Sequence, residues 1–318
     1  MQNISLQGKL AFVFPGQGSQ AVAMLSDFTD NKIVQDTFKE SSDALGYDLW
    51  QLVSQGPAEQ LNQTNFTQPA LLTASVALWR VWQEESQVMP AILAGHSLGE
   101  YSALVCAGVI SLTDGVKLVE KRGQYMQSCV PAGVGAMAAV IGLDDQAIID
   151  ACKQGQEDEV VSAVNFNSPG QVVIAGHKAA VERAGNLCKA AGAKRVLPLP
   201  VSVPSHCALM TDAADKLAKD LENITFNAPT IDVVNNVDVA IEKSSEAIKT
   251  ALVKQLYSPV RWSETISKLG EQGITQMVEV GPGKVLQGLV KRINKAISCV
   301  SLNTEDSLEK AKELTQES

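Results

Sequence analysis

The chain has 318 residues, of which 45% are hydrophobic and 19% are charged, and its formal net charge is −9 at pH 7. Most chains that fold around a single hydrophobic core are shorter, so this length predicts one large domain with a smaller one. The negative charge argues against a protein that binds nucleic acid or a membrane surface, because both need a basic face.

The sequence also indicates a compartment. No run of residues approaches the roughly 18 apolar residues of a membrane-spanning helix, and Met1–Ser5 lacks the basic start of a signal peptide. The six cysteines are scattered without metal-ligand spacing. We therefore expect reduced thiols in a cytoplasmic protein, with no metal site.

The chain opens with a predicted buried strand at residues 10–14, which ends in the glycine-rich loop 15–20. The loop lacks the glycine spacing of dinucleotide-binding proteins and the Lys-Ser/Thr pair of P-loops, so neither kind of nucleotide site is expected. Its backbone amides, such as that of Gln17, are candidate donors to an oxyanion, and a plain strand-to-helix turn explains the loop equally well. Helices follow over 33–45 and 68–85, where apolar residues recur with helical spacing.

Residues 91–108 predict a short strand, a sharp turn and a helix. The turn is the Gly-x-Ser-x-Gly pentapeptide Gly95-His96-Ser97-Leu98-Gly99. Between a strand and a helix this pattern is typical of a nucleophile elbow, although so short a motif also occurs by chance. The elbow strains the backbone of its serine and aims the side chain at the helix N-terminus. We therefore predict Ser97 as a nucleophile and the amide of Leu98 as an oxyanion donor.

Arg122 lies on the apolar face of the next predicted helix, 111–129. Its neighbours three and four residues away are Leu118, Val119, Tyr125 and Met126. A charge on such a face is costly to bury unless it meets an anion. Two partners remain open, a carboxylate of a ligand and a carboxylate of the protein itself.

A second unit is predicted after a boundary at 130–133. Its elements are a strand at 136–141, a helix at 144–153, strands at 160–165 and 171–175, a helix at 178–190 and a strand at 195–199. This β-α-β-β-α-β order is the ferredoxin-like plan. The extended segment 200–206 leads back to the large domain. The remaining predicted elements are a helix from His206 to residue 223, a strand at 231–234, helices at 248–257 and 263–271, a strand at 277–280, a helix ending at Arg292 and a strand at 298–302.

A serine nucleophile needs a base, and the chain has three histidines. His96 adjoins Ser97 on the sharp turn, so its ring is expected to point away. His177 begins a helix of the small unit, where capping or a surface position explains it. His206 is left at the junction of the two units, with a core histidine as the alternative. No acidic residue between Ser97 and His206 ends a convincing strand, so a backbone carbonyl is expected to orient the base.

Five motifs occur together and in order. They are Phe14-Pro15-Gly16-Gln17-Gly18-Ser19-Gln20, Gly95-His96-Ser97-Leu98-Gly99-Glu100-Tyr101, Asn165-Phe166-Asn167-Ser168-Pro169-Gly170-Gln171, Val203-Pro204-Ser205-His206 and Glu279-Val280-Gly281-Pro282-Gly283. Jointly they resemble the malonyl-CoA:acyl carrier protein transacylases of bacterial fatty-acid synthesis, over about residues 12–289.

The expected fold is α/β, with an α/β-hydrolase-like large domain that carries an inserted ferredoxin-like (βαββαβ) small domain. The large domain is expected to comprise residues 1–128 and 204–318, and the small domain residues 129–203.

The resemblance implies a role for each matching position. Ser97 is implied to be the acylated nucleophile and His206 its base, and the main-chain carbonyl of Gln255 is implied to hold the imidazole. The amides of Gln17 and Leu98 are implied to form the oxyanion hole. Arg122 is implied to bind the malonyl carboxylate, and Asn165 to support the substrate site. Ser205 departs from the family pattern, because many relatives have an aromatic residue just before the base histidine. The preference for malonyl over methylmalonyl therefore rests more on Leu98 and Arg122 than on this segment.

The partners implied by the resemblance are malonyl-CoA and acyl carrier protein, in a ping-pong reaction without metal or bound cofactor. A monomer is expected, with no nucleic acid or membrane as partner. Carrier proteins are acidic, so docking needs a local basic patch. The candidates are Lys189, Lys194 and Arg195 on the small domain and Lys284, Lys291 and Arg292 on the large one. The alternatives are a serine esterase or thioesterase that uses the same elbow and a catalytically dead module that binds carrier protein.

Overall fold

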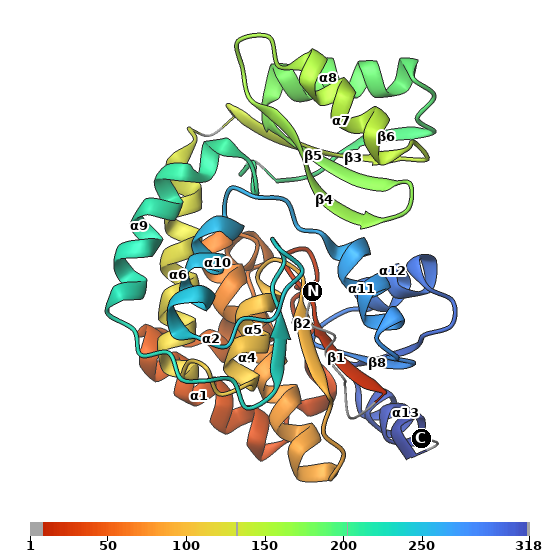
Figure 1. The fold of residues 1–318 in the computed structure, drawn as a ribbon. Coiled ribbons are helices and arrows are strands. Elements are labelled where there is room, and N and C mark those ends of the chain that lie inside the picture. The colour runs from red at the N-terminus through yellow and green to blue at the C-terminus, as the bar shows by residue number, and fades with distance from the viewer. Residues whose placement is uncertain (1–8, 132, 202, 317–318) are drawn as a thin grey trace.

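The computed structural model describes residues 9–131, 133–201 and 203–316. Met1–Ser5, on which the signal-peptide expectation rests, and Ala132, in the predicted boundary, lie outside these ranges. The described chain forms two separate sheets with helices packed against them (Figure 1). Within the described ranges, no helix is both long enough and apolar enough to cross a membrane.

The larger sheet has five strands in the order β7-β2-β1-β8-β9, and all of its pairings are parallel. Its strands are β1 (Leu10–Phe14), β2 (Ile92–Gly95), β7 (Asp232–Val234), β8 (Gln276–Val280) and β9 (Ser298–Leu302). Helices cover both faces of such a sheet, so β1 is apolar and buried at every position. The register pairs Phe14 with Gly95, which sets the loop after β1 beside the turn after β2.

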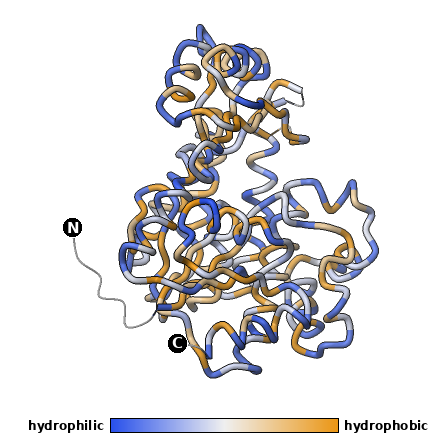
Figure 2. Tube along the Cα trace, turned by 90° about the vertical axis from the view of Figure 1, so that its right-hand side faces the viewer, coloured by the Kyte–Doolittle hydropathy of each residue, from blue (hydrophilic) through white to orange (hydrophobic). Residues whose placement is uncertain are grey.

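Two hydrophobic cores lie on opposite faces of this sheet, because successive side chains of a strand point to opposite sides. Phe12 packs edge-on against Trp79 and Trp82 in one core, and Val13 belongs to the other core with Trp262. Figure 2 shows the hydrophobic residues gathered inside the molecule.

The helices of this larger body are η1 (Ser26–Phe28), α1 (Lys32–Leu45), α2 (Leu49–Gln55), α3 (Ala58–Leu61), α4 (Thr64–Glu85), α5 (Gly99–Cys106), α6 (Leu112–Cys129), η2 (Ala208–Met210), α9 (Thr211–Glu222), α10 (Ser245–Gln255), α11 (Trp262–Glu271), α12 (Val285–Ile293) and α13 (Glu305–Gln316).

The smaller sheet is antiparallel, with the order β4-β5-β3-β6. Its elements are β3 (Gly135–Ile141), α7 (Asp145–Gly155), β4 (Val161–Ser168), β5 (Gln171–His177), α8 (Lys178–Ala190) and β6 (Arg195–Pro198). Helices α7 and α8 cover one face of it. The other face packs Val164 and Val173 against Cys207 of the larger body.

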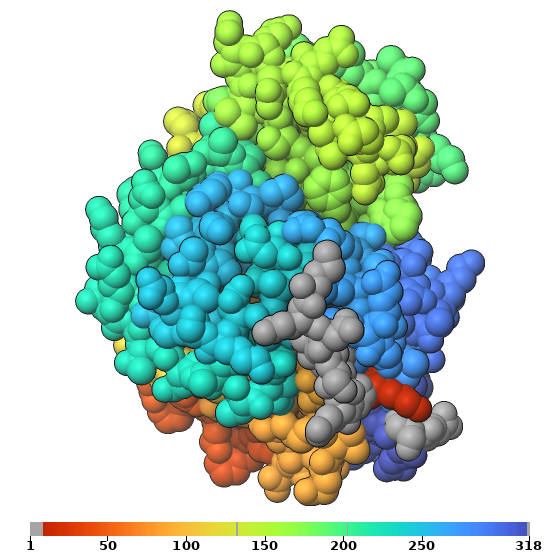
Figure 3. Space-filling model, viewed as in Figure 1, coloured from red at the N-terminus to blue at the C-terminus, as the bar shows by residue number. Residues whose placement is uncertain are grey.

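Main-chain hydrogen bonds join the two bodies. The N–H of Val260 donates to the carbonyl of Val164 at 2.8 Å, and the N–H of Phe166 donates to the carbonyl of Val260 at 3.0 Å. Figure 3 shows the smaller body seated on the larger one. The division into residues 1–128 with 204–318 and residues 129–203 stays a prediction.

Several predicted bounds differ from the structure. The helix expected from His206 begins at Thr211, because His206 has a φ of 65°, which no α-helix contains. Helix α4 begins at Thr64 and keeps Pro69 inside it, at the cost of one backbone hydrogen bond. Helices α2 and α3 were not predicted, because segments of 7 and 4 residues are too short for a periodic pattern.

Candidate active site

The turn between β2 and α5 has the geometry of a nucleophile elbow. Ser97 has a φ of 51°, in the left-handed region that non-glycine residues rarely adopt. A Cβ atom on Gly95 would overlap the backbone of Gly99, and a Cβ on Gly99 would overlap the carbonyl of Phe14. Glycine at both places therefore lets β1, β2 and α5 approach closely enough to expose the serine, and the predicted strain at Ser97 is confirmed.

His206 contacts both Ser97 and the main chain of Gln255. Its Nε2 lies 2.7 Å from Ser97 Oγ, and its Nδ1 lies 2.7 Å from the carbonyl oxygen of Gln255. A carbonyl only accepts hydrogen bonds, so Nδ1 carries the proton and Nε2 is free to accept one from the serine. Burial, and then the charge of Arg122, lowers the pKa of His206 to about 3. The imidazole is therefore neutral near pH 7, as a general base must be.

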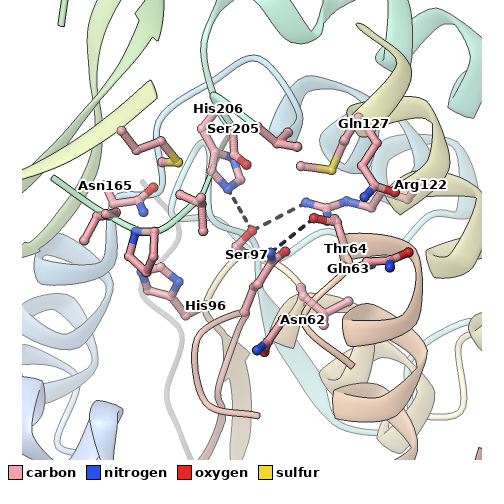
Figure 4. Close-up of a pocket in the computed structure, with 18 residues that line it drawn as sticks. Asn62, Gln63, Thr64, His96, Ser97, Arg122, Gln127, Asn165, Ser205 and His206 are labelled. Carbon is pink, nitrogen blue, oxygen red and sulfur yellow. Dashed lines mark hydrogen bonds between the residues drawn. The ribbon is translucent and has the colours of Figure 1, made fainter. Parts of the chain in front are cut away.

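Arg122 lies on α6 beside the same hydroxyl, with only 1% of its surface exposed. Its Nη1 donates to Gln68 Oε1 at 2.8 Å, and its Nη2 donates to Gln255 Oε1 at 3.0 Å. Nη2 also lies 3.4 Å from Ser97 Oγ. His206 and Arg122 thus reach the serine hydroxyl from different sides (Figure 4). Arg122 forms none of the ion pairs found among the described residues, so the internal salt bridge left open by the sequence is not present there.

A cavity of about 300 Å³ opens over these groups and draws its walls from both bodies. The larger body contributes Gln17, Thr64, Ser97, Leu98, Arg122 and His206, and the smaller one contributes Met137, Asn165 and Leu199, among others. The backbone N–H groups of Gln17 and Leu98 donate to no other group in the part of the chain that the structure describes. The two predicted oxyanion donors therefore belong to residues that line the cavity, and neither amide has another acceptor among the described residues.

Asn165 and the other two histidines have distinct surroundings. Asn165 lines the cavity from β4, and its Oδ1 has no partner among the described residues. His96 points away from Ser97, as expected, and its Nε2 lies 2.8 Å from Asn167 Oδ1. His177 does not cap α8 with its side chain, because its Nδ1 accepts a hydrogen bond from the N–H of Val160 at 2.9 Å.

Three polar residues of the site were not predicted, namely Gln68, Glu100 and Asn236. All three are buried and hydrogen-bonded to predicted site residues or to the elbow. Gln68 stands out in the sequence only as an amide before an apolar helical stretch. Asn236 follows the carboxyl end of β7, the edge of a parallel sheet where ligands bind.

The chain matches the model of one protein family, described as the acyl transferase domain, over residues 11–308. It is 64% identical to the malonyl CoA-acyl carrier protein transacylase of Salmonella typhimurium, over 97% of this chain and 99% of that protein. A crystal structure of an acyl carrier protein S-malonyltransferase from Vibrio cholerae is 63% identical, with a TM-score of 0.94, over 95% of this chain and 99% of that one.

A further solved structure is a complex of a type II PKS acyl-carrier protein with its malonyl-transacylase. It is 62% identical with a TM-score of 0.95, over 96% of this chain and 99% of that one. All of these matches span nearly the whole chain at high identity. The chain therefore belongs to the acyl transferase domain family and, within it, to the malonyl CoA-acyl carrier protein transacylases.

Proposed function

We propose that the protein transfers the malonyl group of malonyl-CoA to the phosphopantetheine thiol of acyl carrier protein through a malonyl ester of Ser97. The observation that carries this proposal is the hydrogen-bonded series Ser97–His206–Gln255 beside the buried Arg122, which forms no ion pair with any residue that the structure describes. The family membership supports the same substrate and the same acceptor.

The first half of the reaction loads the serine. His206 Nε2 takes the proton of Ser97 as Oγ attacks the thioester carbonyl. The amides of Gln17 and Leu98 hold the tetrahedral oxyanion, each contributing roughly 3–4 kcal/mol. The carbon–sulfur bond then breaks, the imidazolium returns its proton to the leaving thiolate, and coenzyme A departs.

The second half transfers the malonyl group to the carrier. The phosphopantetheine thiol gives its proton to His206, and its sulfur attacks the ester carbonyl. The bond from the carbonyl carbon to Ser97 Oγ breaks, and the serine recovers the proton. The cavity between the two bodies limits the access of water to the ester in the interval between the two halves.

Arg122 is proposed to bind the free carboxylate of the malonyl group. One methylene separates that carboxylate from the reacting carbonyl, so its partner has to lie close to the nucleophile, as Nη2 does at 3.4 Å from Ser97 Oγ. A guanidinium offers two parallel donors to a carboxylate, which a lysine cannot reproduce. Asn165 is proposed to support the acyl group from the opposite wall, because it lines the cavity from β4 and its buried Oδ1 has no hydrogen-bond partner among the described residues.

The detailed architecture is also part of the proposal. The elbow between β2 and α5 of a parallel sheet supports an α/β-hydrolase-like large domain. The β3-α7-β4-β5-α8-β6 order and the antiparallel sheet order β4-β5-β3-β6 support an inserted ferredoxin-like domain. We assign residues 129–203 to the inserted domain and residues 1–128 and 204–318 to the large one.

The two candidate basic patches lie close together, and we propose that they form one docking surface for the carrier. Ile141 pairs with Gln171 on one side and with Arg195 on the other. Arg292 Nη1 donates to Gln171 Oε1 at 2.6 Å, which brings α12 to the same end of the small sheet. We define the basic surface as the exposed residues Lys194, Arg195, Lys284, Lys291 and Arg292. The sixth candidate, Lys189, is also exposed, near the C-terminus of α8, and is not included in this definition.

The proposed reaction uses neither a metal nor a bound cofactor, and we propose that a monomer carries it out. We also propose a cytoplasmic location, because all six cysteines are free thiols, the state that a reducing compartment maintains.

Mass spectrometry of the intact protein after exposure to malonyl-CoA tests the proposed function. The wild type is expected to gain one malonyl group on Ser97, and Ser97→Ala none. Carrier protein bearing its phosphopantetheine should then remove the group and become malonylated. Release of free malonate without an adduct would indicate an esterase or thioesterase, and neither adduct nor malonate would indicate a binding module.

A further inference from the structure

Glu100 is a buried carboxylate that none of the proposed reaction steps uses. It lies in the first turn of α5, three residues after the nucleophile, and is 2% exposed. It is not among the residues that line the active-site cavity. One oxygen, Oε2, accepts two hydrogen bonds, from Gln255 Nε2 at 2.8 Å and from the N–H of Asn236 at 2.9 Å.

The bond to Gln255 determines which way that side-chain amide faces. Gln255 Nε2 also donates to the carbonyl of Ser97 at 3.1 Å. With Nε2 turned toward two acceptors, Oε1 is left for Arg122 Nη2, at 3.0 Å. If the amide turned over, it would present its NH₂ group to the guanidinium, and a donor would face a donor. Glu100 provides the shorter of the two hydrogen bonds that fix this amide, and the amide in turn fixes the direction of Arg122.

The bond to Asn236 supports the strained turn itself. Asn236 Oδ1 accepts from the N–H of Ser97 at 2.7 Å, and its Nδ2 donates to the carbonyl of Gly95 at 2.6 Å. These two bonds bridge Gly95 and Ser97 across His96, so they hold the backbone just before the nucleophile and at the nucleophile itself. Glu100 fixes the main chain of Asn236 and so the position of this bridge.

Burial raises the pKa of Glu100 to about 7, although the two donated hydrogen bonds and the charge of Arg122 favour the ionised form. Such burial is costly for a carboxyl group. In either protonation state Oε2 remains an acceptor, so the hydrogen-bonding geometry does not need the charge.

We propose that Glu100 is a positioning residue, whose carboxyl oxygen orients Arg122 through the side-chain amide of Gln255 and holds the Ser97 elbow through Asn236. This inference rests on the proposed function, because it assigns the discrimination between malonyl and uncharged acyl groups to the direction of Arg122. It predicts a loss of discrimination that is larger than the loss of acylation itself.

The test compares loading of the protein by malonyl-CoA and by acetyl-CoA. Glu100→Asp keeps an acid but shortens its reach by one methylene, and Glu100→Leu removes the acceptor. Both are expected to lower the malonyl-to-acetyl ratio of acylation rates at least about tenfold, the scale of a lost hydrogen bond to a charged network. Glu100→Gln retains an oxygen acceptor and is expected to keep the ratio within about threefold of the wild type.

Glu279 offers a matched control on β8. It is also fully buried, accepts two backbone N–H groups, from Leu286 and Gln287, and does not line the cavity. Glu279→Asp therefore makes the same chemical change away from the serine and is expected to leave the ratio unaltered. An equal drop in Glu279→Asp and Glu100→Asp would mean general loosening and would overturn the inference.

A variant of Gln255 tests whether the effect of Glu100 on the ratio passes through the side-chain amide of Gln255. Gln255→Met keeps the main-chain carbonyl for His206 but lacks the side-chain amide. In that background, Glu100→Asp is expected to change the ratio no further. If the wild type takes up malonyl and Glu100→Asp keeps its full preference, the inference alone is overturned. If the wild type takes up no malonyl group, the proposed function is overturned and the inference with it.

Discussion

Arg122 is an unusual buried cation, because its neighbours are two amides, a hydroxyl and the ring of Tyr101, 5.2 Å from the guanidinium carbon. Its Nε has no hydrogen-bond partner among the described residues. Burial lowers its pKa, although a guanidinium stays charged near neutral pH. A cation held in this way recovers part of its desolvation cost when an anionic ligand arrives, so the site is prepared for a carboxylate.

Substitution Arg122→Ala is expected to lower kcat/KM for malonyl-CoA by an amount equivalent to roughly 3–5 kcal/mol, the scale of a broken buried ion pair. Loading by acetyl-CoA should fall much less, since acetyl has no carboxylate. Arg122→Lys should recover only part of the malonyl activity, because lysine keeps the charge but lacks the two parallel donors of the guanidinium. The measurement is the rate of acyl-enzyme formation with each thioester. Equal losses for both thioesters would reject the role of Arg122.

At the scale of elements, buried polar side chains fix two loops at the carboxyl ends of parallel strands. The loop after β2 lines the active-site cavity, and the loop after β8 does not. The loop after β2 is held by Asn236, which contacts the N–H of Ser97 and the carbonyl of Gly95. The loop after β8 is fixed by Glu279, which accepts the N–H of Leu286 and of Gln287 at the start of α12. A carboxyl group at a helix N-terminus satisfies donors that the helix itself leaves free. Side chains, rather than helix or strand propensity, thus set the shape of these loops.

Glu279 gives a stability prediction with a definite sign. Burial raises its pKa to about 7 from 4.5, against the effect of the backbone donors. A carboxyl group with a raised pKa in the folded state contributes stability below its unfolded pKa, and this contribution is lost as the pH rises through 7. Glu279→Gln does not titrate, so its melting temperature should rise relative to that of the wild type between pH 5 and pH 8. A difference between the two proteins that is constant over this range would contradict the prediction.

At the scale of the whole molecule, the site exists only where the two bodies meet. Ser97, His206 and Arg122, the proposed nucleophile, base and carboxylate-binding residue, belong to the larger body, whereas Met137, Asn165 and Leu199 close the cavity from the smaller one. The main-chain bonds between Val260 and β4 hold the smaller body in place. We propose that a carrier protein which delivers its thiol to this cavity docks across both bodies, because the basic surface has residues on each of them.

Charge reversal on the basic surface is expected to impair only the second half of the reaction. The double variants Lys194→Glu/Arg195→Glu and Lys291→Glu/Arg292→Glu should each raise the KM for carrier protein several-fold, because they remove electrostatic attraction. Loading by malonyl-CoA should be unaffected, and added salt should reduce the difference from the wild type. Steady-state kinetics with varied carrier protein provide the measurement.

A control for these variants is Lys310→Glu on α13, which changes an exposed charge far from the smaller body (Figure 1). It should leave the KM for carrier protein unchanged. A KM that stays constant in both double variants, or that rises equally in Lys310→Glu, would remove the basic surface from the proposal.

Much of the site could be predicted from local patterns. The Gly-x-Ser-x-Gly turn indicated Ser97, because a strand, a sharp turn and a helix leave few conformations for the residue between two glycines. The apolar neighbours of Arg122 indicated its inward direction, because helical spacing alone determines which residues share a face. The order of strands and helices between residues 135 and 198 was also readable, because each element has its own apolar period.

Other features could be decided only by the tertiary structure. The sequence left Arg122 with two kinds of partner, and the folded chain surrounds it with amides from α4 and α10 that are 54 and 133 residues away along the chain. Glu100 lies within one of the five motifs and Asn236 follows a strand, but neither pattern indicated what the residue contacts. A buried hydrogen-bond network depends on which segments meet and not on any spacing within one of them. Short-range sterics and apolar periodicity thus determined the elbow and the longer elements by sequence alone, whereas polar contacts between distant segments were decided by the packing of the two bodies.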